Sequence, residues 1–555
     1  MSLQWQSQEP AGRIGPLVER LHGGARDWHY TPLADKARMA REMAERTAAV
    51  AEDWVRAACK AKRIEAGSPA TADEWLAGPN ILLRSLKQLA ASLEQIQKAG
   101  RPALPRFHGL PSSPDLSIHP VAPMDYLAWP GFRCRVQFEQ GWDIERILGA
   151  QAYAYRTNQE PRLSVVLGAG NVSSLPATDL LTEVMVHRRA SILKMSPVNE
   201  YLTPFLEHVY APLIDRAAVA IVRGDANVGR ALCERPEVSH IHLTGSRQTY
   251  DRIASAFGAN GHGRGGVKTL SAELGNVSPA LVVPGHYSER ELDFHARSIA
   301  AMLTNNASFN CNALRVVLTS SRWPQRAAFK EAIRRRLRET PARYAFYPGA
   351  AQRYDAVLDG RTHVDVFGVR ENGVLPWAVI DELDPGSDDP IYQGETFCAV
   401  MGHLALDSTD ELDFLDQAVR FANTKLWGDL NATVIVPSRS RRNSDFERGL
   451  RRAVDDLGYG AVGINHWAAV VYALCSAPWG ARGGGSEQSG RGFTHNTLML
   501  EGVQKAVIEG PVASPIKPPW FADHKTGGRV SQSMLNVEHQ GLPALPRLLL
   551  GALGG

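Results

Sequence analysis

From about Leu163 onward, short apolar runs rich in β-branched residues alternate with segments of helical periodicity. This alternation is typical of βαβ units, in which a crossover helix joins two neighbouring parallel strands. Four strands are predicted at Leu163–Leu167, Ala190–Lys194, Ala218–Val222 and His240–Leu243. Three helices are predicted between them, at Leu175–His187, Tyr201–Leu213 and Asn227–Cys233. The pattern therefore predicts an α/β protein with a parallel sheet.

A second α/β series begins near Ala280, so we place a domain boundary near Glu273. Its strands are predicted at Ala280–Val283, Arg315–Leu318, Trp377–Ile380 and Ala432–Val436. Ahead of both series, residues 33–62 and 82–98 repeat apolar side chains at three- and four-residue spacing, which predicts two amphipathic helices. Residues 100–130 are Pro-rich and are predicted to form an irregular connector.

These observations divide the 555 residues into four regions: 1–150, 151–272, 273–465 and 466–555. The first is a helical region with its connector, and the next two are the α/β units. In the fourth, the residues from Pro511 onward are rich in Pro and Gly and are predicted to form a surface tail. Its last apolar run, Leu548-Leu549-Leu550, favours a disordered tip over a short docking element.

The composition, 44% apolar and 21% charged residues, is that of a soluble globular protein. A net charge of +3, without basic runs interleaved with aromatics, gives no reason to expect a nucleic-acid partner. We expect no secretory signal at the N-terminus (Met1–Trp5) and no membrane span. The six cysteines lack paired spacing, so neither disulfides nor a metal site is expected, and a cytoplasmic location is predicted.

One cysteine, Cys311, is flanked by small polar residues, which suits a nucleophile that must meet a substrate. A lone cysteine is more often a small core residue, so a second observation is needed. Glu273 precedes it by 38 residues, and an acid within reach could activate either a water molecule or the thiol as general base.

Two strand ends carry glycine-containing turns. Gly168-Ala169-Gly170-Asn171 suggests a dinucleotide loop, but Ser173 replaces its third glycine, so a plain strand-to-helix turn is an equal alternative. In Leu243-Thr244-Gly245-Ser246, free backbone N–H groups would suit a phosphate, although Ser246 could simply be a helix N-cap.

Read in order, seven short segments resemble the aldehyde dehydrogenase superfamily over residues 160–505, about two thirds of the chain. The segments are Gly170-Asn171, Ile192-Leu193-Lys194, Leu243-Thr244-Gly245-Ser246, Glu273-Leu274-Gly275, Asn310-Cys311, Glu395-Thr396-Phe397 and Asn465. The resemblance implies a Rossmann-like nucleotide-binding domain at 151–272, a catalytic domain at 273–465 and an oligomerisation segment within 466–555. It also implies a homodimer or homotetramer.

The resemblance further implies catalytic roles for three residues. Cys311 would attack the aldehyde carbonyl, and Asn171 with the Cys311 backbone N–H would form the oxyanion hole. Glu273 would activate the water that hydrolyses the resulting thioester.

Five residues would bind NAD or NADP according to the same resemblance. Lys194 matches the residue that hydrogen-bonds the adenosine ribose, and Gly245 with Ser246 matches the pyrophosphate turn. Glu395 matches the carboxylate on the nicotinamide ribose, and Phe397 the aromatic residue beside it.

The sequence also departs from the family pattern. Pro197 stands where an acidic residue often opposes a 2′-phosphate, and Asn276 replaces the last glycine of the usual Glu-Leu-Gly-Gly. These departures suggest an outlying subfamily, in which Phe309, Trp467 and Tyr472 are candidate pocket-lining positions.

Oxidation of an aldehyde to a carboxylic acid is the predicted function. The alternatives are a CoA-linked aldehyde dehydrogenase, which tends to lack the glutamate, and a catalytically silent oligomeric scaffold.

Overall fold

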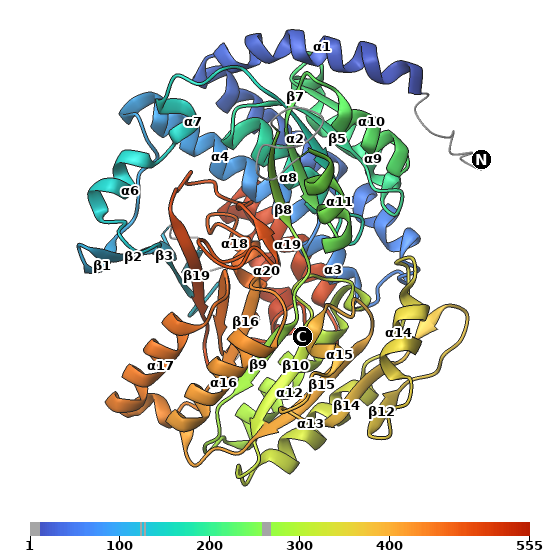
Figure 1. Ribbon diagram of the computed structural model, residues 1–555, viewed down its shortest axis with the longest axis vertical. Coiled ribbons are helices and arrows are strands. Elements are labelled where there is room, and N and C mark those ends of the chain that lie inside the picture. The colour runs from blue at the N-terminus through green and yellow to red at the C-terminus, as the bar shows by residue number, and fades with distance from the viewer. Residues whose placement is uncertain (1–10, 122–124, 127–128, 258–267, 515) are drawn as a thin grey trace.

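The computed structural model describes residues 11–121, 125–126, 129–257, 268–514 and 516–555. The N-terminal stretch Met1–Trp5, where no signal is expected, lies outside these residues. Two large sheets form the two halves of the molecule, one above the other in Figure 1. No helix within the described ranges is long and apolar enough to cross a bilayer.

The smaller sheet has six strands in the order β18-β8-β7-β4-β5-β6. Its strands are β4 (Leu163–Leu167), β5 (Ala190–Lys194), β6 (Val219–Val222), β7 (Val238–Thr244), β8 (Thr269–Glu273) and β18 (Gly490–Arg491). All pair in parallel except β18, which is antiparallel to β8. The predicted bounds of β4 and β5 are confirmed, and those of β6 and β7 differ by one or two residues.

Helices cover both faces of this sheet, which explains why its strands are continuously apolar. One face packs against residues of α2, α4, α8 and α9, and the other against α1 and α10. These helices are α1 (Ala11–Tyr30), α2 (Leu33–Ala61), α4 (Pro79–Ala99), α8 (Leu175–Leu181), α9 (Thr203–Ile214) and α10 (Ala226–Glu234). The two amphipathic helices predicted ahead of the sheet correspond to α2 and α4.

The larger sheet has eleven strands in the order β1-β2-β3-β19-β17-β16-β9-β10-β15-β14-β12. The seven strands from β19 to β14 are parallel to their neighbours, and antiparallel strands extend both edges. The parallel strands are β9 (Ser278–Val282), β10 (Leu314–Ser320), β14 (Trp377–Leu383), β15 (Val400–Leu406), β16 (Asn431–Ile435), β17 (Ala461–Ile464) and β19 (Val503–Glu509). Helices α12 (Glu289–Thr304), α13 (Arg326–Glu339), α16 (Glu411–Lys425) and α17 (Ser444–Asp456) share its main core.

The Pro-rich segment at 100–130, predicted to be irregular, contributes two edge strands to this sheet. β1 (Phe107–Leu110) pairs with β2 (Ser113–His119), which pairs with β3 (Arg133–Phe138). The prediction was wrong here because β1 is largely exposed and lacks an apolar alternation. Backbone pairing, rather than burial, defines such an edge strand.

The last residues also differ from the predicted surface tail. They form α19 (Gly527–Gln540) and α20 (Leu545–Leu553), and α19 packs against α3 (Thr71–Leu76) and α4. Leu548, predicted to lie in a disordered tip, is buried among residues of α19. Figure 1 shows these C-terminal helices near the middle of the molecule. The prediction was wrong because Pro and Gly stand mainly at the ends of these helices.

The remaining elements are short or peripheral. They are α6 (Ile144–Ala150), α7 (Tyr153–Arg156), α11 (Arg247–Phe257), α14 (Ala350–Leu358), α15 (Pro390–Gln393), α18 (Val470–Leu474), β11 (Arg343–Tyr344), β12 (Val364–Phe367) and β13 (Val374–Leu375), with a π-helical turn at Thr182–Val186 and 3₁₀ turns at Glu200–Leu202, Asn305–Ser308, Ser440–Arg442 and Leu542–Ala544.

Candidate active site

The two sheets are joined directly at Glu273. This residue ends β8 of the smaller sheet, and β9 of the larger sheet begins five residues later, at Ser278. A segment near the C-terminal end of the chain packs at the same point. Gly490 of β18 pairs with Glu273, and the Leu274 N–H donates to the Ser489 carbonyl. A side chain at position 273 therefore lies where the two sheets meet.

The predicted nucleophile and the predicted acid are in direct contact. The Cys311 thiol donates to Glu273 Oε1 at 2.9 Å. Burial raises the pKa of Glu273 to about 7, which Asp179 reinforces by repulsion. Burial and the neighbouring Glu273 carboxylate raise the pKa of Cys311 well above its usual range. The resting pair is thus a neutral thiol facing a carboxyl group that titrates near neutral pH.

Cys311 is presented by a backbone turn of unusual conformation. The 3₁₀ turn after α12 places Asn306, Ala307 and Ser308 in succession at φ of 50°, 54° and 71°. Left-handed backbone costs an L-residue of the order of 1 kcal/mol each, so this turn must be held by its surroundings.

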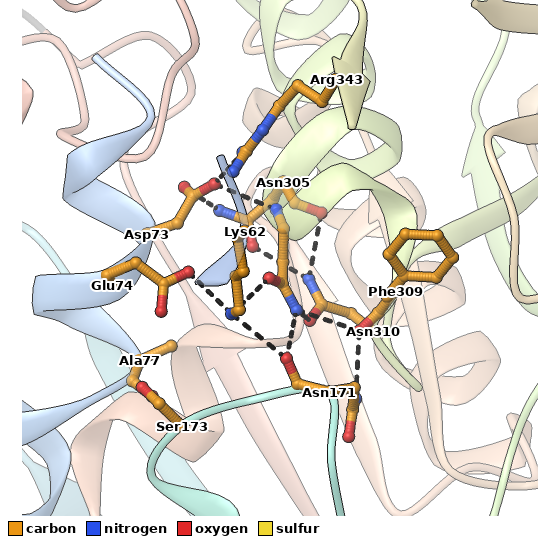
Figure 2. Close-up of polar contacts among 11 residues, drawn as sticks. Lys62, Asp73, Glu74, Ala77, Asn171, Ser173, Asn305, Phe309, Asn310 and Arg343 are labelled. Carbon is orange, nitrogen blue, oxygen red and sulfur yellow. Dashed lines mark hydrogen bonds and ion pairs between the residues drawn. The ribbon is translucent and has the colours of Figure 1, made fainter. Parts of the chain in front are cut away.

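The side chain of Asn306 provides much of this support. Figure 2 labels its hydrogen-bond partners Lys62, Asn171, Phe309 and Asn310. Its amide nitrogen donates to the backbone carbonyls of Asn171 (2.9 Å) and Phe309 (3.1 Å) and to Asn310 Oδ1 (3.1 Å). Its Oδ1 accepts from Lys62 Nζ at 2.8 Å. With Asn306 only 4% exposed, these contacts fix the turn without help from solvent.

Lys62 comes from the end of α2, in the N-terminal region for which the sequence suggested no role. Its ammonium group pairs with Glu74 of α3 at 2.7 Å, and both side chains are almost fully buried. It also donates to the Asn171 carbonyl at 3.3 Å. A single buried cation therefore contacts both the turn before Cys311 and the loop after β4.

The neighbouring Asp73 of α3 holds the same turn from another side. Its carboxylate accepts the Asn306 backbone N–H at 3.0 Å and the Asn305 side-chain amide at 2.6 Å. Arg343 of β11 compensates its charge at 2.6 Å. Arg315, fully buried in β10, donates to the carbonyl and hydroxyl of Ser308 at the far end of the turn. Sequence reasoning missed these groups because no motif marks them.

Asn171, the predicted oxyanion donor, lies in this network as well. Its side-chain amide donates to the Phe309 carbonyl at 3.0 Å, two residues before Cys311. The glycines that precede it allow close packing rather than a special backbone angle. A Cβ on Gly170 would lie 2.5 Å from Ser196 Oγ, so that side of the loop has no room for a side chain.

Glu395 and Phe397, two of the predicted cofactor residues, lie near the same point. Glu395 is close enough to Cys311 to raise the thiol pKa further, and burial raises the pKa of Glu395 itself to about 7. Its Oε1 is buried and accepts no hydrogen bond from the residues that the structure describes. A Cβ on Gly275 would lie 2.3 Å from Glu395 Oε2, so glycine is needed for this close approach.

The Phe397 ring packs at 4.9 Å from Tyr347 and 5.7 Å from Phe309. Its position beside Glu395 is therefore fixed by an aromatic cluster.

The other three predicted cofactor residues lie at the carboxyl ends of strands in the smaller sheet. Lys194 ends β5, and Gly245 and Ser246 follow β7. β4 lies between these two strands, at the point where the strand order reverses. Ligands of open α/β sheets bind at such a switch point. Ser246 Oγ accepts a hydrogen bond from the Thr249 N–H at 3.3 Å, as expected for a helix N-cap. The Ser246 hydroxyl still lies at the carboxyl end of β7.

Two further residues of the segments compared with the family, Asn276 and Asn465, form hydrogen bonds that support the larger sheet. Asn276, which departs from the family motif, is fully buried and donates to Ser278 Oγ and the Asn431 carbonyl, so it joins β9 to β16. Asn465 accepts the Val436 N–H at 2.8 Å and adopts φ of 62°.

A cavity of about 290 Å³ opens beside Cys311 and Glu273. Trp467 and Tyr472, predicted to line a pocket, are among its walls. Phe309 is not, because it is buried in the aromatic cluster with Phe346, Tyr347 and Phe397. Sequence reasoning missed the contributions of Trp129, Trp479 and Trp520.

Comparisons with known proteins agree with this architecture. The model of the aldehyde dehydrogenase family matches residues 190–346. Betaine aldehyde dehydrogenases of Rhizobium etli and Rhizobium leguminosarum are 29% and 26% identical, each over 66% of this chain and 73% of their own length.

Solved structures show the same fold. One is a glyceraldehyde-3-phosphate dehydrogenase of Methanocaldococcus jannaschii complexed with NADP, with a TM-score of 0.62 at 13% identity over 92% of this chain and 97% of that one. Another is a mutant aldehyde dehydrogenase C of Pseudomonas syringae with NAD+ and octanal, with a TM-score of 0.61 at 15% identity over 92% and 91%. The chain is therefore similar to the aldehyde dehydrogenase family in sequence over residues 190–346, and to solved aldehyde dehydrogenases in fold over most of its length.

Proposed function

We propose that this protein oxidises an aldehyde to a carboxylic acid with NAD or NADP, and that Cys311 is the nucleophile. The observation that carries the proposal is the 2.9 Å contact between the Cys311 thiol and the Glu273 carboxylate, at the wall of a cavity. A thiol is a poor nucleophile until it loses its proton, and an adjacent base provides the means.

In the first step, Glu273 accepts the thiol proton while Cys311 Sγ forms a bond to the carbonyl carbon. Because burial raises the pKa of Glu273 to about 7, the carboxyl group can both accept and release a proton near neutral pH. The much higher pKa of the thiol keeps the proton on sulfur until a substrate is attacked.

The carbonyl oxygen becomes an oxyanion during this attack, and two donors are available. Asn171 uses one amide hydrogen on the Phe309 carbonyl, which leaves the second for the oxyanion. The second donor is the Cys311 backbone N–H, which hydrogen-bonds its own sulfur and so acts against the rise in the thiol pKa that burial causes. Donors fixed before the reaction stabilise the developing charge at little reorganisation cost.

The residues present fit a nicotinamide dinucleotide. The unpaired, buried Glu395 Oε1 suits a ribose hydroxyl, and Lys194 with Gly245 and Ser246 offers donors at the switch point of the smaller sheet. When bound, NAD or NADP supplies a hydride acceptor for the carbon attached to Cys311. The nucleotide-binding role of residues 151–272 and the catalytic role of 273–465 are part of this proposal.

The thioester left on Cys311 is then hydrolysed. Glu273 first releases the thiol proton to solvent and then removes a proton from water as the water attacks the acyl carbon. Cys311 leaves as the thiolate and takes that proton back from Glu273, which restores the resting pair. The names of the relatives are consistent with such chemistry, since they include betaine aldehyde dehydrogenases and an enzyme solved with octanal. A homodimer or homotetramer and a cytoplasmic location complete the proposal.

An assay with the purified protein tests the function. We would incubate it with a panel of aldehydes and NAD or NADP, with and without CoA, and follow the absorbance of the reduced cofactor. Formation of the free acid without CoA is expected. Strict dependence on CoA would identify the protein as CoA-linked, and no turnover with any aldehyde would favour a silent scaffold.

A further inference from the structure

The cavity beside Cys311 is built largely by the two ends of the chain. Its volume of about 290 Å³ is roughly twice that of a ~150 Å³ cavity that holds benzene. Leu76 and Ile81 come from the end of α3 and the start of α4, and Met534 and Val537 come from α19. Leu548 of α20 completes this side. These helices therefore give the cavity an apolar wall, with the charged residues Arg84, Lys87 and Glu538 of α4 and α19 also at the cavity.

Aromatic rings form the other walls. Trp129 and Trp520 lie stacked with ring centroids 6.3 Å apart, and Tyr472 meets Trp479 edge to face at 5.8 Å. All four residues line the cavity. Flat, rigid rings favour apolar and especially aromatic ligand bodies.

The charged groups at the cavity already have protein partners. Arg84 pairs with Glu538 at 2.9 Å and with Asp125 at 3.2 Å, and Asp73 pairs with Arg343. Lys87 is exposed and hydrogen-bonds the Glu538 carbonyl. A charged substrate would have to break one of these pairs or enter the apolar region unpaired, and both are costly.

We propose that the substrate of the reaction proposed above is an uncharged aldehyde with a bulky apolar body, about the size of two fused rings. Its carbonyl group lies at Cys311, and its body lies between the aromatic walls and α19. Met534 of α19 is a specificity residue. This inference rests on the proposed function only in taking the ligand to be an aldehyde, since the shape and polarity of the cavity select the body.

The first test compares aldehydes with the full-length protein. The values of kcat/KM for 2-naphthaldehyde, acetaldehyde, 4-carboxybenzaldehyde and the cationic betaine aldehyde are measured under one condition. We expect 2-naphthaldehyde to exceed each of the others by about 100-fold, the range that apolar pocket contacts give. A faster reaction with the small or the charged aldehydes overturns the inference while leaving aldehyde oxidation intact.

Binding separates this inference from the proposed function. Quenching of tryptophan fluorescence by 2-naphthalenemethanol, ethanol and 4-(hydroxymethyl)benzoate needs no turnover. Tight binding of the naphthyl alcohol alone supports the inference even if no aldehyde is oxidised. Equal or weaker binding of the naphthyl alcohol overturns it.

A matched pair of variants tests the contribution of α19. Met534→Glu places a charge at the cavity wall, and Gln540→Glu places the same charge on the same helix at an exposed position outside it. We expect Met534→Glu to lower the preference for 2-naphthaldehyde over acetaldehyde at least tenfold, and Gln540→Glu to leave it unchanged. Met534→Gln serves if the charged variant fails to fold. An unchanged preference in a folded Met534 variant overturns the assignment of this wall.

Discussion

The sheets and the chain ends contribute different kinds of residue to one site. Glu273 ends a strand and Cys311 precedes one, and both are groups whose chemistry depends on their pKa. The N-terminal helices contribute Lys62 and Asp73, which hold the turn before Cys311, and the C-terminal helix α19 contributes an apolar wall. The comparison teaches that reacting groups require particular residue types, whereas support and shape can be supplied by many sequences.

The largest expected effect comes from the sheet side of this comparison. Cys311→Ala should lower kcat by about 10⁴-fold or more, because no other group can form the covalent bond. Cofactor binding, followed by fluorescence titration, should be retained. Cys59→Ala is the control, because burial raises the pKa of that thiol to about 12 and makes it inert. Persisting activity in Cys311→Ala would refute the assigned nucleophile.

Glu273→Gln should reduce the rate by about 10³-fold, the middle of the range for general bases. In the wild type, kcat/KM should fall about tenfold per pH unit below pH 7, because the raised pKa keeps Glu273 protonated there. Stopped-flow measurement of the hydride burst should show that the variant loses this increase in rate around pH 7 and recovers only in more alkaline solution, where the thiol ionises. A normal burst with slow steady-state turnover would mean that Glu273 acts on water alone.

Substitutions near the N-terminal end should lower kcat less, and they should also lower the melting temperature. Lys62→Met should lower kcat by about 100-fold, as a small misplacement of reacting groups does. It should also lower the melting temperature, since Glu74 is left buried and unpaired. Lys60→Met, at an exposed position on the same helix, should change neither.

A double variant distinguishes positioning from stability. Lys62→Met with Glu74→Met removes both buried charges, so much of the melting temperature should return. Asn306 Oδ1 still lacks its donor, so kcat should stay low. Recovery of kcat together with the melting temperature would show that Lys62 only stabilises the fold.

The smallest expected effect concerns cofactor choice. Glu200 and Asp225 are close enough to Lys194 to act on its pKa, so a 2′-phosphate near this lysine would meet two carboxylates. We expect kcat/KM to favour NAD over NADP by about tenfold, the effect of roughly 1.4 kcal/mol. Glu200→Gln keeps the oxygen that accepts the Gly224 N–H and should reduce this preference, whereas Glu234→Gln on the exposed face of α10 should not. A preference for NADP in the wild type would contradict the prediction that Glu200 and Asp225 disfavour a 2′-phosphate near Lys194.

The sequence alone predicted eight parallel strands, four in each sheet, and the order of the chemical groups along them. Buried parallel strands require continuous apolar runs, and a nucleophile with its base requires particular side chains, so both leave a pattern in the chain. The tertiary structure decided that the Cys311 thiol contacts Glu273, that Asn276 and Asn465 are structural, and that Phe309 lies outside the cavity.

The tertiary structure alone also gave the chain ends their place. Lys62 meets Asn306 across 244 residues of sequence, and Arg84 meets Glu538 across 454. A contact between residues so far apart has no local signal, because each partner looks like an ordinary charged residue on a helix. Only the fold brings such partners together, and burial then strengthens the hydrogen bond or ion pair between them.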